Sequence, residues 1–221
     1  MKYTALATEK KTEKMPEKKP AKSGKVVARK AKPPGEIRII GGQYKRTKLP
    51  VANKPGLRPT PDRVRETLFN WLGQDLTGWR CADVFAGTGA LGFEAASRGA
   101  AEVVLVERDP QLVRSLRASR ERLQASRLRI EAADAVTFMR RGPAASQDLV
   151  FLDPPFDAGL FESALAAAAA LVAPGGFVYL EADRLFDATT VEPLGLHPYR
   201  HAQAGAVHFH LFQRPAAADT A

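Results

Sequence analysis

The sequence predicts an α/β protein with a mostly parallel, seven-stranded sheet and helices on both of its faces. Two observations predict this class. From about residue 80, short segments rich in Val and Leu alternate with segments of helical periodicity, as in parallel strands joined by crossover helices. The chain has 221 residues, 45% of them hydrophobic, which is enough for one sizeable domain with appendages.

Residues 1–36 are expected to be a disordered basic tail. They carry 11 Lys and Arg against 4 Asp and Glu, which accounts for +7 of the net charge of +9, and almost no aromatic or branched apolar side chains. Such a segment buries too little apolar surface to offset the entropy of ordering. The tail either touches phosphate groups or only aids solubility. Residues 216–221 are also expected to be disordered.

Residues 37–73 are expected to form a β-hairpin and a helix before the main sheet. Ile37–Ile40 and Gln43–Leu49 are predicted strands, joined by a tight turn at Gly41-Gly42. The second strand carries several basic side chains beside Tyr44.

The helix of this region is predicted over residues 61–72. Apolar residues recur at helical spacing from Val64 to Leu72. Thr60 is the predicted N-cap and Pro61 the first helical residue.

Residues 74–215 are expected to hold the main sheet. Its strands are predicted at residues 81–85, 103–107, 129–132, 149–152, 177–181 and, as a hairpin around Ala204-Gly205, within 196–213. The intervening helices are predicted near residues 89–98, 110–125, 135–141 and 159–172. Pro174-Gly175-Gly176 is expected to end the last of these helices.

A glycine-rich turn joins the first of these strands to the helix that follows. Gly87, Gly89 and Gly92 fit the pattern G-x-G-x-x-G, in which the backbone approaches a ligand and the helix start offers free N–H groups. Glu107 closes the next strand, where its carboxylate can accept both hydroxyls of a ribose. Nicotinamide enzymes share these features. Asp83, however, would oppose a pyrophosphate and suits the positively charged amino acid end of S-adenosylmethionine.

Asp134 and Ala135 follow the next strand. The Asp134 carboxylate can accept a bond from an adenine amino group, or cap the following helix, or do both. The carboxyl ends of parallel strands meet at the edge where open α/β sheets bind ligands. We therefore expect Asp83, Glu107 and Asp134 to line one S-adenosylmethionine site.

The run Asp153-Pro154-Pro155-Phe156 ends the fourth strand on the same edge. Taken alone, it fits a proline turn. Beside a methyl donor, the Asp153 carboxylate and the Pro154 carbonyl can accept the N–H bonds of a planar amine, and Phe156 can stack on its ring. Catalysis would then consist mostly of positioning the nitrogen for in-line transfer. The alternative for Phe156 is ordinary core packing.

The single cysteine and the four histidines are expected to be structural. Cys81 excludes an internal disulfide and suits a reducing compartment. His208 and His210 share a strand face, but no Cys or close acid completes a set of ligands, so no metal is expected. The chain begins without an apolar signal segment and has no run long enough to span a membrane, so a soluble, cytoplasmic protein is expected.

At these motifs the chain resembles the class I S-adenosylmethionine-dependent methyltransferases and, more narrowly, the RsmD family of 16S rRNA guanine-N2 methyltransferases. The resemblance covers about residues 37–213, and its most specific stretches are Arg38–Tyr44 and Leu57–Leu72. It implies a Rossmann-like fold and methylation of a guanine N2 in 16S rRNA, within an assembled or assembling small ribosomal subunit. The Lys-rich tail departs from the family pattern, and we expect a monomer.

The motifs and the resemblance together assign three groups of residues. The catalytic group is Asp153, Pro154, Pro155 and Phe156. The cofactor-binding group is Asp83, Phe85, Gly87, Thr88, Gly89, Glu107, Arg108, Asp134 and Ala135. The RNA-binding group is Tyr44, Lys45, Arg46, Lys48, Arg58, Thr60 and Arg63, with Arg65 beside it.

Three other functions stay open at the level of sequence. The first is an amino-methyltransferase that acts on another RNA or on DNA, and the second is a noncatalytic RNA-binding assembly factor on the same fold. A nicotinamide dehydrogenase is disfavoured by Asp83 and by the run that begins at Asp153.

Overall fold

The computed structural model describes residues 35–52, 54 and 60–216, which fall within a single unit, Pro34–Ala221. The predicted tail, except for its last two residues, lies outside the described residues, as do Arg58 and residues 217–221. Within the described part, no helix is long and apolar enough to cross a membrane.

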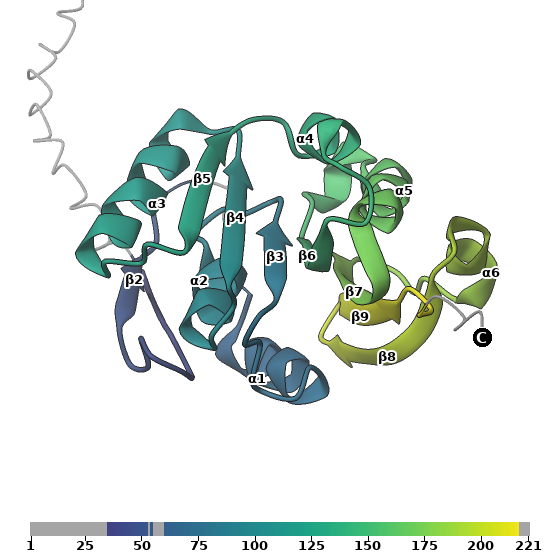
Figure 1. Ribbon diagram of the computed structural model, residues 1–221, viewed down its shortest axis with the longest axis horizontal. Coiled ribbons are helices and arrows are strands. Elements are labelled where there is room, and N and C mark those ends of the chain that lie inside the picture. The colour runs from purple at the N-terminus through teal and green to yellow at the C-terminus, as the bar shows by residue number, and fades with distance from the viewer. Residues whose placement is uncertain (1–34, 53, 55–59, 217–221) are drawn as a thin grey trace, which may run out of the picture. The chain divides into compact units, whose positions relative to one another are not determined.

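The main sheet has seven strands in the order β5-β4-β3-β6-β7-β9-β8 (Figure 1). Their bounds are Arg80–Asp83 (β3), Glu102–Glu107 (β4), Leu128–Ala132 (β5), Gln147–Leu152 (β6), Val172–Ala182 (β7), His197–Ala204 (β8) and Val207–Gln213 (β9). Strands β3 to β7 are parallel, and β9 runs antiparallel to both β7 and β8. The predicted fold class is therefore confirmed. Because the strand order reverses between β3 and β6, a topological switch point lies there.

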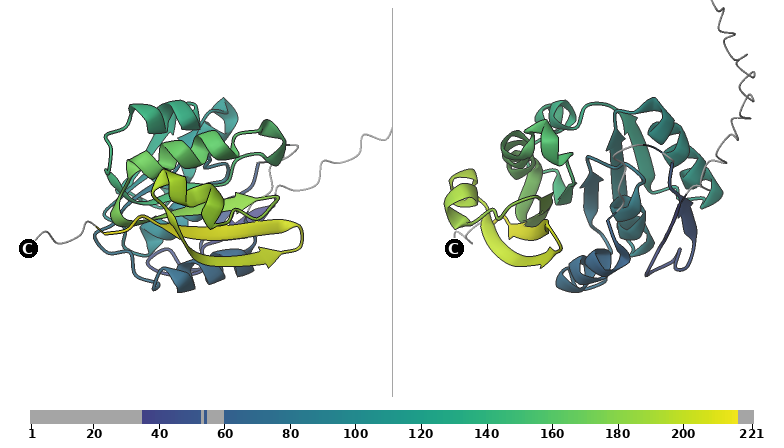
Figure 2. Two further views of the ribbon diagram at one scale, coloured as in Figure 1. Left: turned by 90° about the vertical axis from the view of Figure 1, so that its right-hand side faces the viewer. Right: turned by 180° about the vertical axis from the view of Figure 1, so that it is seen from behind.

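Helices cover both faces of this sheet, as the left view of Figure 2 shows. Their bounds are Asp62–Trp71 (α1), Ala90–Ser97 (α2), Pro110–Arg122 (α3), Ala135–Arg141 (α4), Phe161–Leu171 (α5) and Ala188–Val191 (α6), with 3₁₀ turns at Phe156–Ala158 (η1) and Glu192–Leu194 (η2). Apolar residues of α1, α2 and α3 join one core cluster, and those of α4, α5 and α6 join the other.

Strand β4 shows why the sequence carries continuous apolar runs. Val103 and Leu105 belong to the first core cluster, whereas Val104 and Val106 belong to the second. All four are at most 2% exposed. A strand covered by helices on both faces must be apolar at every position, so it loses the alternation of a half-exposed strand.

The predicted Gly-Gly hairpin turn is wrong. Strands β1 (Glu36–Arg38) and β2 (Lys48–Pro50) pair along their whole length, with Glu36 opposite Pro50 and Arg38 opposite Lys48. The nine residues 39–47 form a loop between them. Gly42 has φ of 70°, and a Cβ atom built on it would lie 1.7 Å from the carbonyl oxygen of Ser97. The N–H of Gln43 donates to that oxygen at 2.7 Å. The glycines therefore permit close approach of this loop to α2.

Two further local predictions are wrong. Thr60 does not cap α1, which begins at Asp62 without a side-chain cap; the Thr60 hydroxyl instead donates to Glu181 at 2.8 Å. The helix α5 ends at Leu171, and Pro174–Gly176 lie inside β7 rather than at the helix end. In both places a long-range partner outweighs the local signal.

A buried carboxylate, Glu94 of α2, ties the N-terminal region to the main sheet. Its two oxygens accept the N–H groups of Ile40 at 2.9 Å and Gly41 at 2.8 Å. They also pair with Arg65 at 3.2 Å and Arg98 at 2.9 Å. Glu94 and Arg65 are both fully buried, so the expectation that Arg65 faces RNA is wrong.

Candidate active site

Acidic side chains from five consecutive parallel strands meet at the carboxyl edge of the sheet. They lie at or just beyond the strand ends and are Asp83, Glu107, Asp134, Asp153 and Glu181. Asp83 on β3 pairs in register with Phe151 on β6, so Asp83 and Asp153 stand on the two strands that flank the switch point. The structure therefore brings the predicted cofactor acids and the predicted catalytic acid to one edge.

The glycine turn between β3 and α2 is shaped by close packing. Gly87 and Gly89 have φ of 52° and 78°, in the left-handed region that favours glycine. A Cβ atom at Gly89 would lie 2.7 Å from Leu116 and Phe93, and one at Gly92 would lie 2.0 Å from Leu105. Gly87 and Thr88 keep partial exposure. They are thus the part of the turn that a ligand can reach.

Asp83 lies beneath this turn and is 2% exposed. Its Oδ2 atom accepts the N–H of Gly92 at 2.9 Å. Burial raises the pKa of Asp83 to about 7, with smaller contributions from Glu107 and Glu181, against the opposing effect of the Gly92 bond. Among the described residues, no Lys or Arg forms an ion pair with Asp83. A cationic group of a ligand would supply the missing opposite charge.

Glu107 is oriented by two backbone donors. Its Oε2 atom accepts the N–H of Gly87 at 2.9 Å, and its Oε1 atom accepts the N–H of Asp109 at 2.8 Å. Each carboxylate oxygen keeps a second lone pair. The partly exposed carboxylate can therefore still accept the hydroxyl groups of a ribose.

Asp134 caps α4, as one of the two sequence-based readings predicts. Its Oδ1 atom accepts the N–H of Thr137 at 2.8 Å, and this bond lowers the pKa of the carboxyl. Asp134 is exposed and Ala135 beside it is buried. Arg108 is exposed and Phe85 is partly buried against the second core cluster. Their roles toward a cofactor stay predictions.

The run from Asp153 to Phe156 follows β6 and leads into η1. Asp153 is partly exposed, Pro154 is buried and Pro155 is exposed. Phe156 begins η1 and is 38% exposed, with its ring centroid 5.9 Å from that of Phe161. A phenylalanine with this exposure is not ordinary core, and its ring is available for stacking.

Glu181 is a site residue that the sequence analysis missed. Leu152 pairs in register with Leu180, so Asp153 and Glu181 follow on neighbouring strands. Burial, Glu181 and Asp83 raise the pKa of Asp153 well above its usual range. The signal available in the sequence was a glutamate within the predicted strand 177–181.

Two hydroxyl groups hold Glu181 in place. Its Oε1 atom accepts from Thr60 at 2.8 Å and from Tyr179 at 2.9 Å. Thr60 is 5% exposed and its hydroxyl is used by Glu181, so the expectation that Thr60 contacts RNA is wrong. This bond connects the residues that precede α1 to the carboxyl edge of the sheet.

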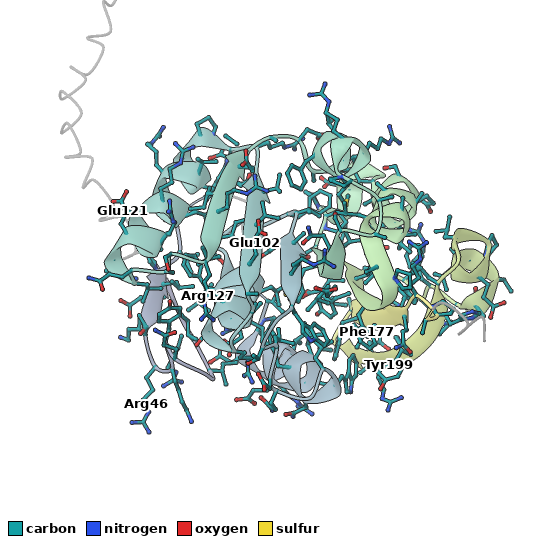
Figure 3. The ribbon with its side chains drawn as sticks, in the orientation of Figure 1. Arg46, Glu102, Glu121, Arg127, Phe177 and Tyr199 are labelled. Carbon is teal, nitrogen blue, oxygen red and sulfur yellow. The ribbon has the colours of Figure 1, made fainter. Side chains whose placement is uncertain are left out.

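The other predicted RNA-binding residues are mostly exposed. Lys45, Arg46, Lys48 and Arg63 are exposed, and Tyr44 is partly buried against the first core cluster. Arg46 points away from the rest of the chain in Figure 3. Lys48 forms an ion pair of 2.6 Å with Glu36, which neutralises part of this charge.

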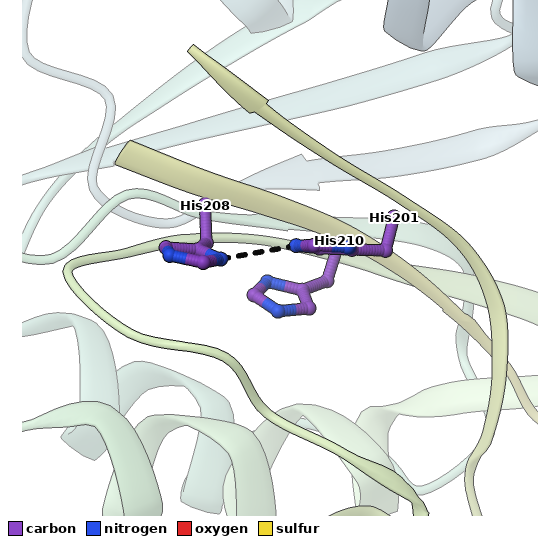
Figure 4. Close-up of side chains that lie close together, drawn as sticks. All are labelled: His201, His208 and His210. Atoms are coloured by element: carbon purple, nitrogen blue, oxygen red, sulfur yellow. Dashed lines mark hydrogen bonds between the residues drawn. The ribbon is translucent and has the colours of Figure 1, made fainter. Parts of the chain in front are cut away.

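The C-terminal hairpin gathers three of the four histidines (Figure 4). His201 on β8 pairs in register with His210 on β9, and His208 shares the face of His210. Burial and His201 lower the pKa of His210 to about 4, and burial also lowers the pKa of His201. The sequence analysis missed this group because His201 joins it only through strand pairing.

The sheet order and the acids at its carboxyl edge define the class I S-adenosylmethionine-dependent methyltransferase fold. A precorrin-6y C5,15-methyltransferase from Geobacter metallireducens has this fold, with a TM-score of 0.59 and 19% identity over 74% of this chain and 93% of that one. At this identity the likeness concerns the fold alone.

The family is shown by closer relatives. The family described as Conserved hypothetical protein 95 matches residues 37–213. A relative named ribosomal RNA small subunit methyltransferase D from Escherichia coli is 41% identical, over 84% of this chain and 94% of the relative. The solved structure of yhhF from Escherichia coli has a TM-score of 0.72 and 36% identity, over 83% of this chain and all of that one. This chain belongs to the RsmD family of methyltransferases, which confirms the resemblance.

Proposed function

We propose that this protein transfers a methyl group from S-adenosylmethionine to the exocyclic N2 amine of a guanine in 16S rRNA. The observation that carries the proposal is the pair formed by Asp153, half-buried with a raised pKa, and the exposed ring of Phe156, beside the glycine turn. Relatives named ribosomal RNA small subunit methyltransferase D support rRNA as the substrate. The proposal includes action as a monomer, in the cytoplasm, on an assembled or assembling small subunit.

The residues at the sheet edge fit S-adenosylmethionine. Asp83 would face the ammonium group, Glu107 the ribose hydroxyls, and Asp134 with the Ala135 N–H the adenine. The buried, unpaired carboxyl of Asp83 supports this orientation, because burial of a carboxylate needs an opposite charge. When bound, the cofactor supplies an electrophilic methyl group on a positively charged sulfur.

The acceptor amine needs help because its lone pair is delocalised into the purine ring. Asp153 and the carbonyl of Pro154 would accept its two N–H bonds and turn the lone pair toward the methyl group. Phe156 would stack on the base, which must leave its helix to reach the site. Formation of the N–C bond would be matched by breaking of the S–C bond, and the nitrogen would then lose a proton. The raised pKa of Asp153 makes its carboxylate a suitable acceptor for that proton.

Basic residues near the N-terminus would hold the RNA. Lys45, Arg46 and Arg63 are exposed on the loop before β2 and on α1. Exposed cations of this kind contact phosphate groups and position a nucleic acid without reading its sequence.

Methyl-transfer assays with Asp153→Asn test the proposal. The substrates are hypomethylated small subunits and naked 16S rRNA, with labelled S-adenosylmethionine and nucleoside mass spectrometry of the product. We expect N2-methylguanosine with the wild type, and a loss in kcat on the order of 10²–10³ with Asp153→Asn, because the uncharged amide stabilises the developing positive charge on the nitrogen less and cannot take up its proton. Calorimetry should show nearly unchanged cofactor binding. Asp157→Asn, an exposed site in η1, is the matched control and should stay active.

Three results would contradict the proposal. Full activity of Asp153→Asn would remove Asp153 from the mechanism. Methylation only of DNA or of another RNA would favour a different amino-methyltransferase. Absence of S-adenosylmethionine binding would favour a noncatalytic assembly factor.

A further inference from the structure

The hairpin of β8 and β9 places three imidazole rings side by side at one end of the sheet. One ring nitrogen of each of His201, His208 and His210 lies within 4.8 Å of the other two (Figure 4). His201 Nε2 and His208 Nδ1 are 3.1 Å apart and share a hydrogen bond. The rings come from two strands, so their proximity depends on the register of β8 and β9.

These separations suit a metal ion. Two nitrogens bound to tetrahedral Zn²⁺ at about 2.0–2.1 Å each are roughly 3.3 Å apart, close to the separation of the His201 and His208 nitrogens. Both side chains keep solvent exposure, so small ring rotations can direct both lone pairs at one ion. The proton that now links the two rings would be replaced by the metal.

His210 provides the third ligand and has a suitable outer partner. Its Nδ1 atom lies 3.4 Å from the carbonyl oxygen of Leu180, and metal-bound histidines commonly donate their second N–H to a carbonyl. Its Nε2 atom accepts the N–H of Phe186 at 3.1 Å. Metal binding must exchange that bond for a metal–nitrogen bond, which lowers the affinity. We therefore expect binding in the micromolar range.

We propose that His201, His208 and His210 form a binding site for a divalent transition metal with a preference for imidazole, such as Zn²⁺. Three histidines leave a fourth position for water, and neutral imidazole is a suitable ligand for such ions. The ion would link the edge strand β8 to β9. The proposal is independent of the methyl-transfer function, because the site lies on the hairpin and uses none of the catalytic residues.

Zinc titration of the untagged, full-length protein tests the site. The chain has four histidines in all, so His197 provides a matched control in the same hairpin. His197 is exposed, near Glu192 at 3.5 Å, and does not belong to the group. After removal of metal by a chelator, ZnCl₂ is added in competition with a chromogenic chelator. We expect one equivalent to bind the wild type and His197→Gln, with at least tenfold weaker binding to His201→Gln and to His208→Gln.

A second measurement separates loss of the site from loss of the fold. Circular dichroism should show that His197→Gln, His201→Gln and His208→Gln are each folded without metal. Zn²⁺ should raise the Tm of the wild type and of His197→Gln, and leave the Tm of the other two variants unchanged. The proposal is overturned if the wild type binds no stoichiometric Zn²⁺, if either His201→Gln or His208→Gln binds as the wild type does, or if His197→Gln loses affinity equally.

Discussion

Asp83, the proposed partner of the cofactor ammonium group, carries a cost in stability that Asp83→Asn should reveal. The side chain is 2% exposed and its pKa is raised to about 7 from an ordinary value of 3.8. The difference, 7 − 3.8, is roughly 3 units, and each unit corresponds to about 1.4 kcal/mol. Folding with an ionised Asp83 therefore costs about 4 kcal/mol relative to a protonated one.

The pH dependence of this cost has a definite sign. Between pH 3.8 and about 7 the folded protein binds a proton at Asp83 that the unfolded chain has lost. The contribution of Asp83 to the free energy of unfolding thus falls by about 1.4 kcal/mol per pH unit across this window and is constant above it. Asparagine stays neutral and can accept the Gly92 N–H through its amide oxygen. Asp83→Asn should therefore be more stable than the wild type by up to about 4 kcal/mol at pH 8, but by only about 1 kcal/mol at pH 4.5.

Urea denaturation at the two pH values measures this difference. Calorimetry at pH 8 should show at least tenfold weaker S-adenosylmethionine binding by the variant, because the ammonium group loses its counter-charge. Asp134→Asn is the control: Asp134 is exposed with a lowered pKa, so its variant should gain no stability at pH 8. Equal stability differences at pH 4.5 and pH 8, or a less stable Asp83→Asn at pH 8, would refute the reasoning.

Three other predictions concern stability and rate. Glu94→Gln should lose about 3–5 kcal/mol of stability in urea denaturation, because it removes the buried charge that pairs with both Arg65 and Arg98 and leaves Arg65 only the half-exposed Asp62, whereas exposed Glu162→Gln should lose less than about 1 kcal/mol. Gly42→Ala should lower the Tm far more than Gly205→Ala: both glycines have positive φ, but only the first added Cβ would meet an atom, at 1.7 Å. The methyl-transfer rate should rise with pH through an apparent pKa well above 3.8, because protonation of Asp153 removes the acceptor; a flat profile down to pH 4 would contradict this.

Much of the fold could be predicted from the sequence because its signals are local. Alternating apolar runs and helical segments located all seven strands of the main sheet within a few residues, apart from an earlier start of β7 at Val172. The short helix α6 was missed because four residues carry too little periodicity to be recognised. The Gly-Gly pair was misplaced because glycine permits both a tight turn and a close approach, and only the position of Ser97 decides between them.

The residues of the candidate site also fall into two groups: those that the sequence predicts and those that only the tertiary structure brings together. The sequence by itself placed four of the five acids at the carboxyl edge, since every parallel strand must end there and Asp83, Glu107, Asp134 and Asp153 lie at or near the end of a predicted strand. The tertiary structure alone decided which side chains meet from distant segments. Glu181 accepts a hydrogen bond from Thr60, which is 121 residues away in the sequence, and Glu94 accepts one from Arg65, which is 29 residues away.

The physical reason is that a buried polar group must find a partner wherever the fold supplies one. Local spacing predicts the face of a strand or helix on which a side chain lies, but not the residue opposite it. Arg65 is therefore a buried partner of Glu94 and not an RNA contact, and His201 joins His208 and His210 through the register of β8 and β9.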